Sequence, residues 1–145
     1  MSIVGERAEA LAELTCDRRA ARWAEIVAWH EAVAAGEWVG KGHRSPSAWM
    51  AAATGEPVGA CKRVLTLGER LEKMPRVANL FRVGLVSEAA VGLVADVWSE
   101  DVAAAFERDE LLFADWISHR PFREAKIKVE AWAAIEQRNA AEEQT

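Results

Sequence analysis

Side chains suited to catalysis or metal binding are few in this sequence, and their spacing forms no catalytic or metal-ligand pattern. His30, His43 and His119 share no short spacing with one another or with a carboxylate. His-Glu-x-x-His, paired Cys motifs, Gly-rich phosphate loops and Gly-x-Ser-x-Gly are all absent. The sequence therefore predicts no catalytic residue, no metal ligand, no cofactor and no small-molecule substrate, and we expect no enzymatic activity.

Basic side chains form the second group that can do chemistry, because they bind phosphates. The 145 residues carry a net charge of −5, but the charge is uneven along the chain: −3 over residues 1–40, +5 over 41–82 and −7 over 83–145. Such asymmetry concerns partners rather than fold. It indicates an anionic partner for the basic middle, with uneven scatter of surface charge as the alternative.

The basic middle contains a pattern typical of a helix-turn-helix. This motif needs a short first helix, a small residue where the helices cross, Gly near the turn, and a second helix with an apolar inner face. Ala51 supplies the small residue, and Gly55 supplies the turn four positions later. The inner face of the second helix is made of Cys61, Val64 and Leu65. Thr54 and Glu56 stand at positions that are usually apolar, so an ordinary helical corner is the alternative.

Two basic residues of the second helix lie off its apolar face. Lys62 and Arg63 are therefore available to phosphates or base edges, and we expect them nearest to DNA when this helix enters a major groove. Five more residues are expected to hold phosphates: Lys41, His43 and Arg44 in the preceding loop, and Arg70 and Lys73 further along.

Helices must position these residues, because the composition predicts an all-α fold. The chain has 29 Ala, no Tyr and only four Pro, and no segment alternates with the period of a strand. A length of 145 residues suits one domain with its own core. We predict a single all-α domain of about six to seven helices.

Proline, glycine and capping residues predict where the helices begin and end. They give a long N-terminal helix over 3–35, a helix-turn-helix-like core over 45–98 and a C-terminal helical pair over 99–140. Ser45 and Ser87 are the expected N-caps. The polar stretch 15–22 is where the first helix could break, and residues 138–145 are expected to fray.

The tryptophans and cysteines indicate which side chains lie in the core and in which compartment the protein is expected. Trp23, Trp29, Trp116 and Trp132 fall on apolar helical faces and are expected in the core, whereas the position of Trp38 stays open. Two cysteines are too few for a disulfide framework, so we expect a reduced, cytoplasmic setting. The sequence shows no apolar run long enough to span a membrane and no secretory signal at its start.

Residues 48–97 carry a longer pattern of expected helices and short connections between them. Its features are Leu67-Gly-Glu-Arg-Leu71, Met74-Pro75, Leu80-Phe-Arg-Val-Gly84 and Val86-Ser87-Glu-Ala-Ala90. Their order and spacing resemble the helix-turn-helix region of the ParB chromosome-partitioning family. The His-Ala-Arg that commonly follows Ser in that family is replaced by Ala89-Ala90-Val91.

A second set of motifs covers nearly the whole chain. They are Asp17-Arg-Arg-Ala20, Gly42-His-Arg-Ser45, Ala48-Trp49, Thr54-Gly55, Leu71-x-x-Met-Pro75, Gly84-x-x-Ser87, and the stretch from Leu111 through Pro121 to Trp132. This set resembles the actinobacterial domain of unknown function 222, the 13E12 repeat family, which usually stands N-terminal to an HNH endonuclease domain. The resemblance implies an intracellular DNA-associated protein, often carried by mobile elements or prophages. It implies no nuclease activity, because that family's nuclease motif lies beyond this domain.

Two functions follow from these observations. The first is a double-stranded DNA-binding module of a mobile-element or prophage-type, HNH-nuclease-associated protein, with a homodimer or a nuclease as a possible further partner. The alternative is a protein-interaction or regulatory domain that dimerises, positions or inhibits a partner nuclease. Ion pairs between Lys62, Arg63 or Arg70 and the acidic side chains of residues 1–40 or 83–145 would favour the alternative.

Overall fold

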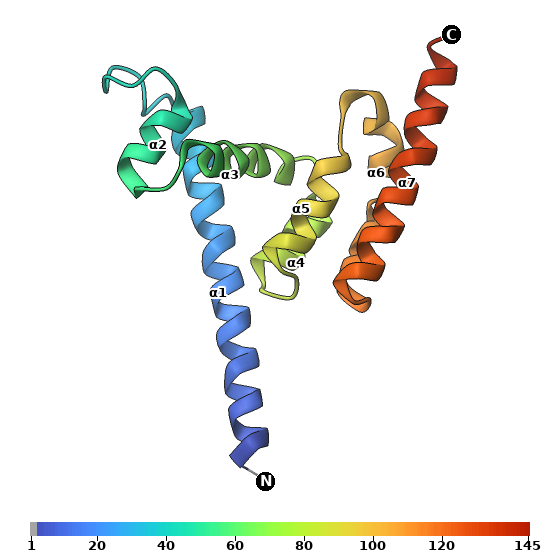
Figure 1. The fold of residues 1–145 in the computed structure, drawn as a ribbon, viewed down its shortest axis with the longest axis horizontal. Helices are drawn as coiled ribbons and strands as arrows, with labels where there is room; N and C mark the ends of the chain where they lie inside the picture. Colours follow the sequence, from blue (N-terminus) through green and yellow to red (C-terminus); the bar gives the residue numbers. More distant parts are fainter. Residues whose placement is uncertain (1–2) are drawn as a thin grey trace.

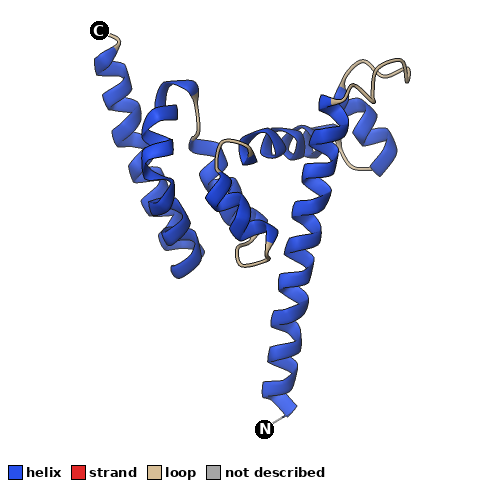
Figure 2. Ribbon diagram, turned by 180° about the vertical axis from the view of Figure 1, so that it is seen from behind, coloured by secondary structure: helices blue, strands red, loops and turns tan. Residues whose placement is uncertain are grey.

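Seven α-helices and one turn of 3-10 helix make up the computed structural model, which describes residues 3–145 and contains no strand within them (Figure 2). In chain order they are α1 (Ile3–Ala34), α2 (Pro46–Thr54), α3 (Val58–Leu71), α4 (Pro75–Arg82), α5 (Glu88–Val97), the 3-10 turn η1 (Glu100–Val102), α6 (Ala103–His119) and α7 (Phe122–Glu143). The prediction of a single all-α domain is confirmed.

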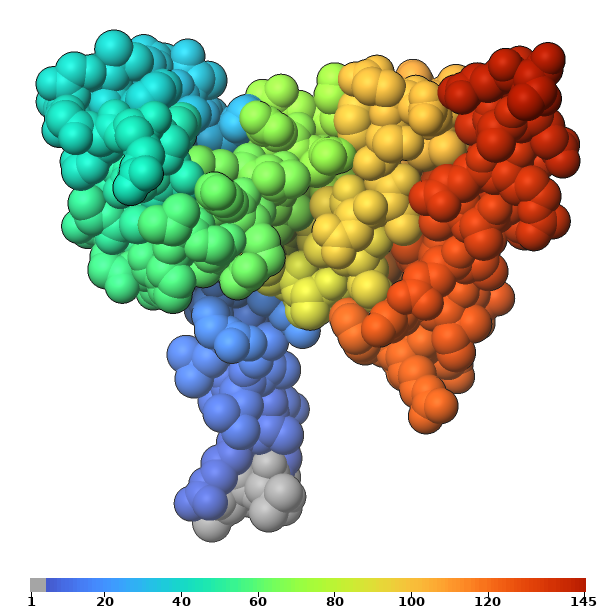
Figure 3. Space-filling view, turned by 45° about the horizontal axis from the view of Figure 1, so that its top comes forward, coloured from blue at the N-terminus to red at the C-terminus, as the bar shows by residue number. Residues whose placement is uncertain are grey.

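From left to right, Figure 1 shows α2, then α1 and α3, then α4 and α5, and finally α6 and α7. The short helix α2 and the longer α3 pack at the C-terminal end of α1, α4 and α5 lie in the middle, and α6 and α7 pair on the far side. The N-terminal part of α1 projects beyond the rest of the molecule (Figure 3). One core cluster runs through the molecule, from Ile26 of α1 and Cys61 of α3 to the fully buried phenylalanines Phe81, Phe106 and Phe113.

The first helix is one long helix, as the expected range 3–35 has it, and the last helix is longer than expected. The first helix does not break in the stretch 15–22: α1 is continuous, because no Pro or Gly interrupts that stretch and two of its arginines find partners in the rest of the fold, Arg19 at the Gly84 carbonyl and Arg22 at Glu88. Residues 138–143 do not fray either, since α7 continues to Glu143. Ala140 packs against the core, and the Gln144 side chain donates a hydrogen bond to Asp101 at 3.2 Å.

The capping and turn residues act as the sequence predicts. The Ser45 hydroxyl accepts the Ala48 N–H at 3.1 Å to begin α2, and the Ser87 hydroxyl accepts the Ala90 N–H at 3.1 Å to begin α5. Gly55 ends α2 with a φ of 77°, and its N–H bonds the Ala51 carbonyl at 2.8 Å. The polar Thr54 fits this turn because its hydroxyl donates to the Met50 carbonyl and accepts the Glu56 N–H.

The expected core tryptophans lie against the core. Trp132 is buried, and Trp23, Trp29 and Trp116 are partly buried and packed on the core cluster. Trp132 meets the Phe113 ring edge-on, with ring centroids 4.7 Å apart. Trp38, whose position the sequence left open, is half-buried in the loop that follows α1.

Two glycines allow α1 to approach α3 and the α4–α5 turn closely. A Cβ added at Gly84 would lie 2.3 Å from the Cys16 carbonyl oxygen of α1, and Gly84 has a φ of +81°. A Cβ added at Gly68 would lie 2.7 Å from the Cβ of His30. The backbone of the α4–α5 turn and the C-terminal part of α3 therefore both rest directly on α1.

We expect Gly84→Ala to destabilise the fold by roughly 3 kcal/mol or more, because it combines a left-handed φ with an overlap against backbone. The matched control is Gly92→Ala in α5, where an added Cβ meets nothing within 4 Å. That change should stabilise the protein by about 0.5–1 kcal/mol. Urea unfolding of both variants measures the difference, and equal midpoints would contradict the close approach.

A buried carboxylate from α6 caps the start of α4. Glu110 is only 6% exposed, and its Oε2 accepts the backbone N–H groups of Arg76 at 2.7 Å and Val77 at 2.9 Å. Met74, the residue before α4, provides no side-chain cap. Glu110 therefore supplies from a distant helix the negative charge that a helix N-terminus favours.

Glu110→Ala should cost about 2 kcal/mol of unfolding free energy, because two backbone donors lose their acceptor. Glu110→Gln should cost less, since an amide oxygen still accepts. Glu107→Ala removes an exposed carboxylate from the same helix and should change stability by less than about 0.5 kcal/mol. Chemical unfolding of the three variants tests this order, and a Glu110→Ala effect no larger than that of Glu107→Ala would contradict the capping role.

Candidate nucleic-acid interface

The helix α3 has one buried face and one polar face. Its buried residues are Cys61, Val64, Leu67, Gly68 and Leu71. The opposite stripe, at helical spacings of three and four residues, holds Lys62, Arg63, Thr66, Glu69 and Arg70, with Lys73 just beyond the helix. The expectation that Lys62 and Arg63 lie off the apolar face is confirmed, because both side chains are exposed.

The basic side chains of α3 are not neutralised by the acidic parts of the chain. Within residues 3–145, the ion pairs of lysine and arginine involve Arg22, Arg108 and Lys126, and His30 pairs with Glu72. Lys62, Arg63 and Arg70 form no ion pair with any described carboxylate. The polar stripe of α3 therefore carries four cations and one carboxylate, Glu69.

The two cations at the end of α3 have a structural partner. The Arg70 guanidinium lies 4.8 Å from the centre of the Trp98 ring and donates a hydrogen bond to the Trp98 carbonyl at 3.2 Å. The Lys73 ammonium lies 5.4 Å from the same ring. Both keep their charge at the surface, but Arg70 also fixes the end of α5 against α3.

The three expected loop residues lie apart from the α3 stripe. Lys41 and Arg44 are exposed and His43 is half-buried, all in the loop between α1 and α2. Figures 1 and 2 draw this loop beyond α2, whereas the end of α3 that carries Arg70 lies beside α5. The structure thus brings Lys62, Arg63, Arg70 and Lys73 together and leaves the loop residues as a separate group.

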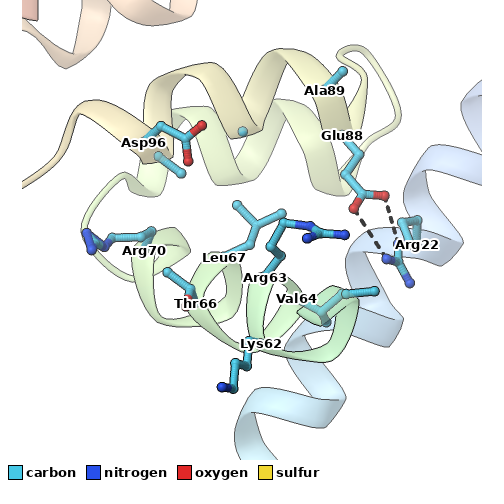
Figure 4. A pocket seen from close by; sticks show the side chains of 13 residues that line it. Arg22, Lys62, Arg63, Val64, Thr66, Leu67, Arg70, Glu88, Ala89 and Asp96 are labelled. Carbon is cyan, nitrogen blue, oxygen red and sulfur yellow. Dashed lines mark hydrogen bonds and ion pairs between the residues drawn. The ribbon is translucent and has the colours of Figure 1, made fainter. Parts of the chain in front are cut away.

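A groove of about 750 Å³ runs between α3 and α5 (Figure 4). Arg63 extends along it toward Glu88, while Lys62 points away from α5. One end is closed by Arg22 of α1, whose Nε donates to Glu88 at 2.8 Å. This hydrogen bond raises the pKa of Arg22 above its usual value, against the effect of burial.

A second basic segment was not found when the net charge was summed over the three long segments of the sequence. Arg120, Arg123, Lys126 and Lys128 lie at the corner between α6 and α7, with one carboxylate, Glu124, among them. The strongly acidic total of residues 83–145 hid them, and a charge window of about ten residues would have found them. Arg22 was also missed as a groove residue, because no sequence signal pairs it with Glu88.

The remaining observations of the described residues concern other kinds of site. In residues 3–145, no three His, Cys, Asp or Glu side chains gather in a way that could hold a metal ion. None of the described helices combines the length and apolar character needed to cross a membrane. No protein-family model, curated protein or solved structure matches this chain.

The contacts separate the cations of α3 into packed and free ones. Arg70→Ala should lower stability by about 1–2 kcal/mol, because it removes a hydrogen bond and the stacking on Trp98. Lys62→Ala should change it by less than about 0.5 kcal/mol, since Lys62 forms no hydrogen bond or ion pair with the residues that the structure describes. Thermal unfolding of the two variants measures this, and equal decreases in stability would contradict the assignment.

Proposed function

We propose that this chain is a double-stranded DNA-binding module in which α3 enters the major groove. The observation that supports this most directly is the exposed stripe of α3, whose Lys62 and Arg63 form no ion pair with a described carboxylate. Cations left unpaired on a rigid helix, in a chain with more acidic than basic residues, are available to an anionic partner.

The dimensions of α3 suit this role. Its 14 residues span roughly 21 Å at 1.5 Å per residue, and a helix with side chains is about as wide as the major groove of B-DNA. Residues near the start of a recognition helix contact base edges, and Lys62 and Arg63 are the fifth and sixth residues of α3. Arg70 and Lys73, at the far end, are then placed for the phosphate backbone.

The acidic residues set the expected strength of binding. Glu69 lies on the α3 stripe, and the net charge of −5 repels DNA at long range. Binding should therefore be modest and steeply dependent on salt. The acidic surfaces also disfavour non-specific contacts, and a second copy or a partner protein would add affinity.

The wider biological role rests on the resemblance to the 13E12 repeat family. We propose a module of a mobile-element or prophage-type, HNH-nuclease-associated protein that acts on DNA in the cytoplasm and has no nuclease activity of its own. In this role the module would place a nuclease on duplex DNA.

The alternative is a protein-interaction or regulatory domain that dimerises, positions or inhibits a partner nuclease. The observation that favours it is the projecting start of α1, where Leu11 and Leu14 are each 62% exposed. Exposed apolar side chains on one helix face are typical of a protein-binding surface.

Charge reversal on α3 tests the DNA-binding proposal. Lys62→Glu combined with Arg63→Glu should weaken duplex binding at least tenfold and leave thermal unfolding nearly unchanged, because both side chains are exposed. Fluorescence anisotropy of a labelled duplex at two salt concentrations measures the affinity. The slope of log affinity against log salt should become shallower by about 0.9 for each phosphate that the variant no longer neutralises.

The matched control carries the same change in charge on α7. Arg123→Glu with Arg138→Glu reverses two exposed cations on a helix that packs on α5 and α6. It should retain most of the affinity. An equal decrease in affinity in the two double variants would mean that general positive charge binds DNA, and wild-type affinity in the α3 variant would exclude α3 as the recognition helix.

A further inference from the structure

The start of α1 is a helical arm with an unusual surface. All of residues 6–14, which we call the arm, are exposed, and Leu11 and Leu14 are each 62% exposed. The nine residues of the arm are about 14 Å long at a rise of 1.5 Å per residue. The arm continues the packed part of α1, and its two exposed leucines indicate a surface that another element covers.

The arm has three distinct sides. Leu11 and Leu14 lie one turn apart on the same face, as residues three apart do on a helix. Glu6 and Glu13, seven residues apart, share one flank of that face. The other flank carries the small residues Ala8 and Ala12.

The groove between α3 and α5 has matching sides. Its α3 wall carries Arg63 and Arg70, and the apolar residues below them include Leu67. Its α5 wall carries the carboxylates Glu88 and Asp96 toward its two ends and presents Ala89 and Gly92 between them (Figure 4). An added Cβ at Gly92 would meet nothing within 4 Å, so another helix can approach that part of the wall closely. A helix with leucines below, acids on one flank and alanines on the other fits these walls.

The arm of the same chain does not fill this groove. Arg22 of α1 already closes one end of it, and α1 continues as one unbroken helix from there to the arm. The nearest residue of the arm, Leu14, lies roughly 12 Å from Arg22 along the helix axis at 1.5 Å per residue. The arm therefore projects away from the groove, as Figure 3 shows.

We propose that two copies of this chain exchange arms, so that the arm of each copy lies in the α3–α5 groove of the other. Glu6 and Glu13 then face Arg63 and Arg70, and the leucines cover the apolar floor. The same surface patch serves both copies, as a two-fold dimer requires. Arg7 shares the leucine face, so both this arrangement and pairing of the two arms with each other place it at the interface, and a variant that fills the groove separates the two.

The dimer covers the α3 wall that we propose to contact DNA. Arm exchange and duplex binding through Arg63 and Arg70 therefore exclude one another. The arm acts as an acidic competitor for the DNA-binding face, and raising the protein concentration lowers the fraction of free α3.

Sedimentation equilibrium of the full chain over a range of concentrations tests the exchange. The wild type should reach the mass of two chains. Leu11→Asp with Leu14→Asp should remain at the mass of one. The matched control is Leu111→Asp on α6, which changes a leucine of nearly equal exposure (61%) and should still dimerise.

A second variant keeps the arm intact and fills the groove. Gly92→Leu should also give one chain, with circular dichroism showing an unchanged helix content. A monomeric wild type would overturn the proposal, as would a dimer that survives Gly92→Leu but not the arm variant, which would mean that the arms pair with each other.

Duplex titration separates this inference from the proposed function, on which its effect on DNA binding rests. If both hold, Leu11→Asp with Leu14→Asp binds the duplex more tightly than the wild type does. If the chain dimerises through the groove but no variant binds duplex DNA, the arm exchange stands and the DNA-binding proposal fails. If the arm variant binds DNA no more tightly although the wild type dimerises and binds it, the shared-groove arrangement is wrong.

Discussion

The close approach of α1 to α3 and the α4–α5 turn is the constraint on which the rest of the structure depends. At Gly68 and Gly84 there is no room for a Cβ between α1 and the chain that crosses it. These two contacts fix α3 and the α4–α5 turn on one continuous helix. The polar stripe of α3 faces solvent because its opposite face is held against α1 and α5.

The use of acidic side chains explains why a chain of net charge −5 still has free cations on α3. Several carboxylates of the C-terminal half serve internal contacts: Asp109 and Glu136 bind Arg108, and Glu110 caps α4. Asp109 also accepts the indole N–H of Trp132 at 2.8 Å. The Arg108 guanidinium, together with this indole, holds the pKa of Asp109 below its usual value. The bridges that do reach the middle of the chain, Arg22 with Glu88 and His30 with Glu72, lie beside the α3 stripe rather than on it.

Local signals predicted much of this fold because caps and turns depend on neighbouring residues. Ser45, Gly55 and Ser87 act where the sequence placed them, and the two faces of α3 follow from the spacing of its apolar residues. Contacts between distant segments had no such signal: the capping of α4 by Glu110 and the stacking of Arg70 on Trp98 join residues 34 and 28 positions apart. The continuity of α1 shows that a polar stretch alone does not predict a break in a helix. The polar residues 15–22 lie where α1 passes from the packed part of the molecule to its projecting arm, and the helix tolerates them there. The site was predicted in part for the same reason, because helical spacing defines the shared face of α3, whereas the distance from the loop residues to α3 depends on how α2 packs.

An NMR titration of the ¹⁵N-labelled chain with duplex DNA at low salt tests the central claim most directly. We expect the amide signals of α3 around Lys62 and Arg63 to shift most, and those of α7 to stay in place. Shifts confined to the α6–α7 corner, or no shift at all, would contradict the claim that α3 is the surface that meets DNA.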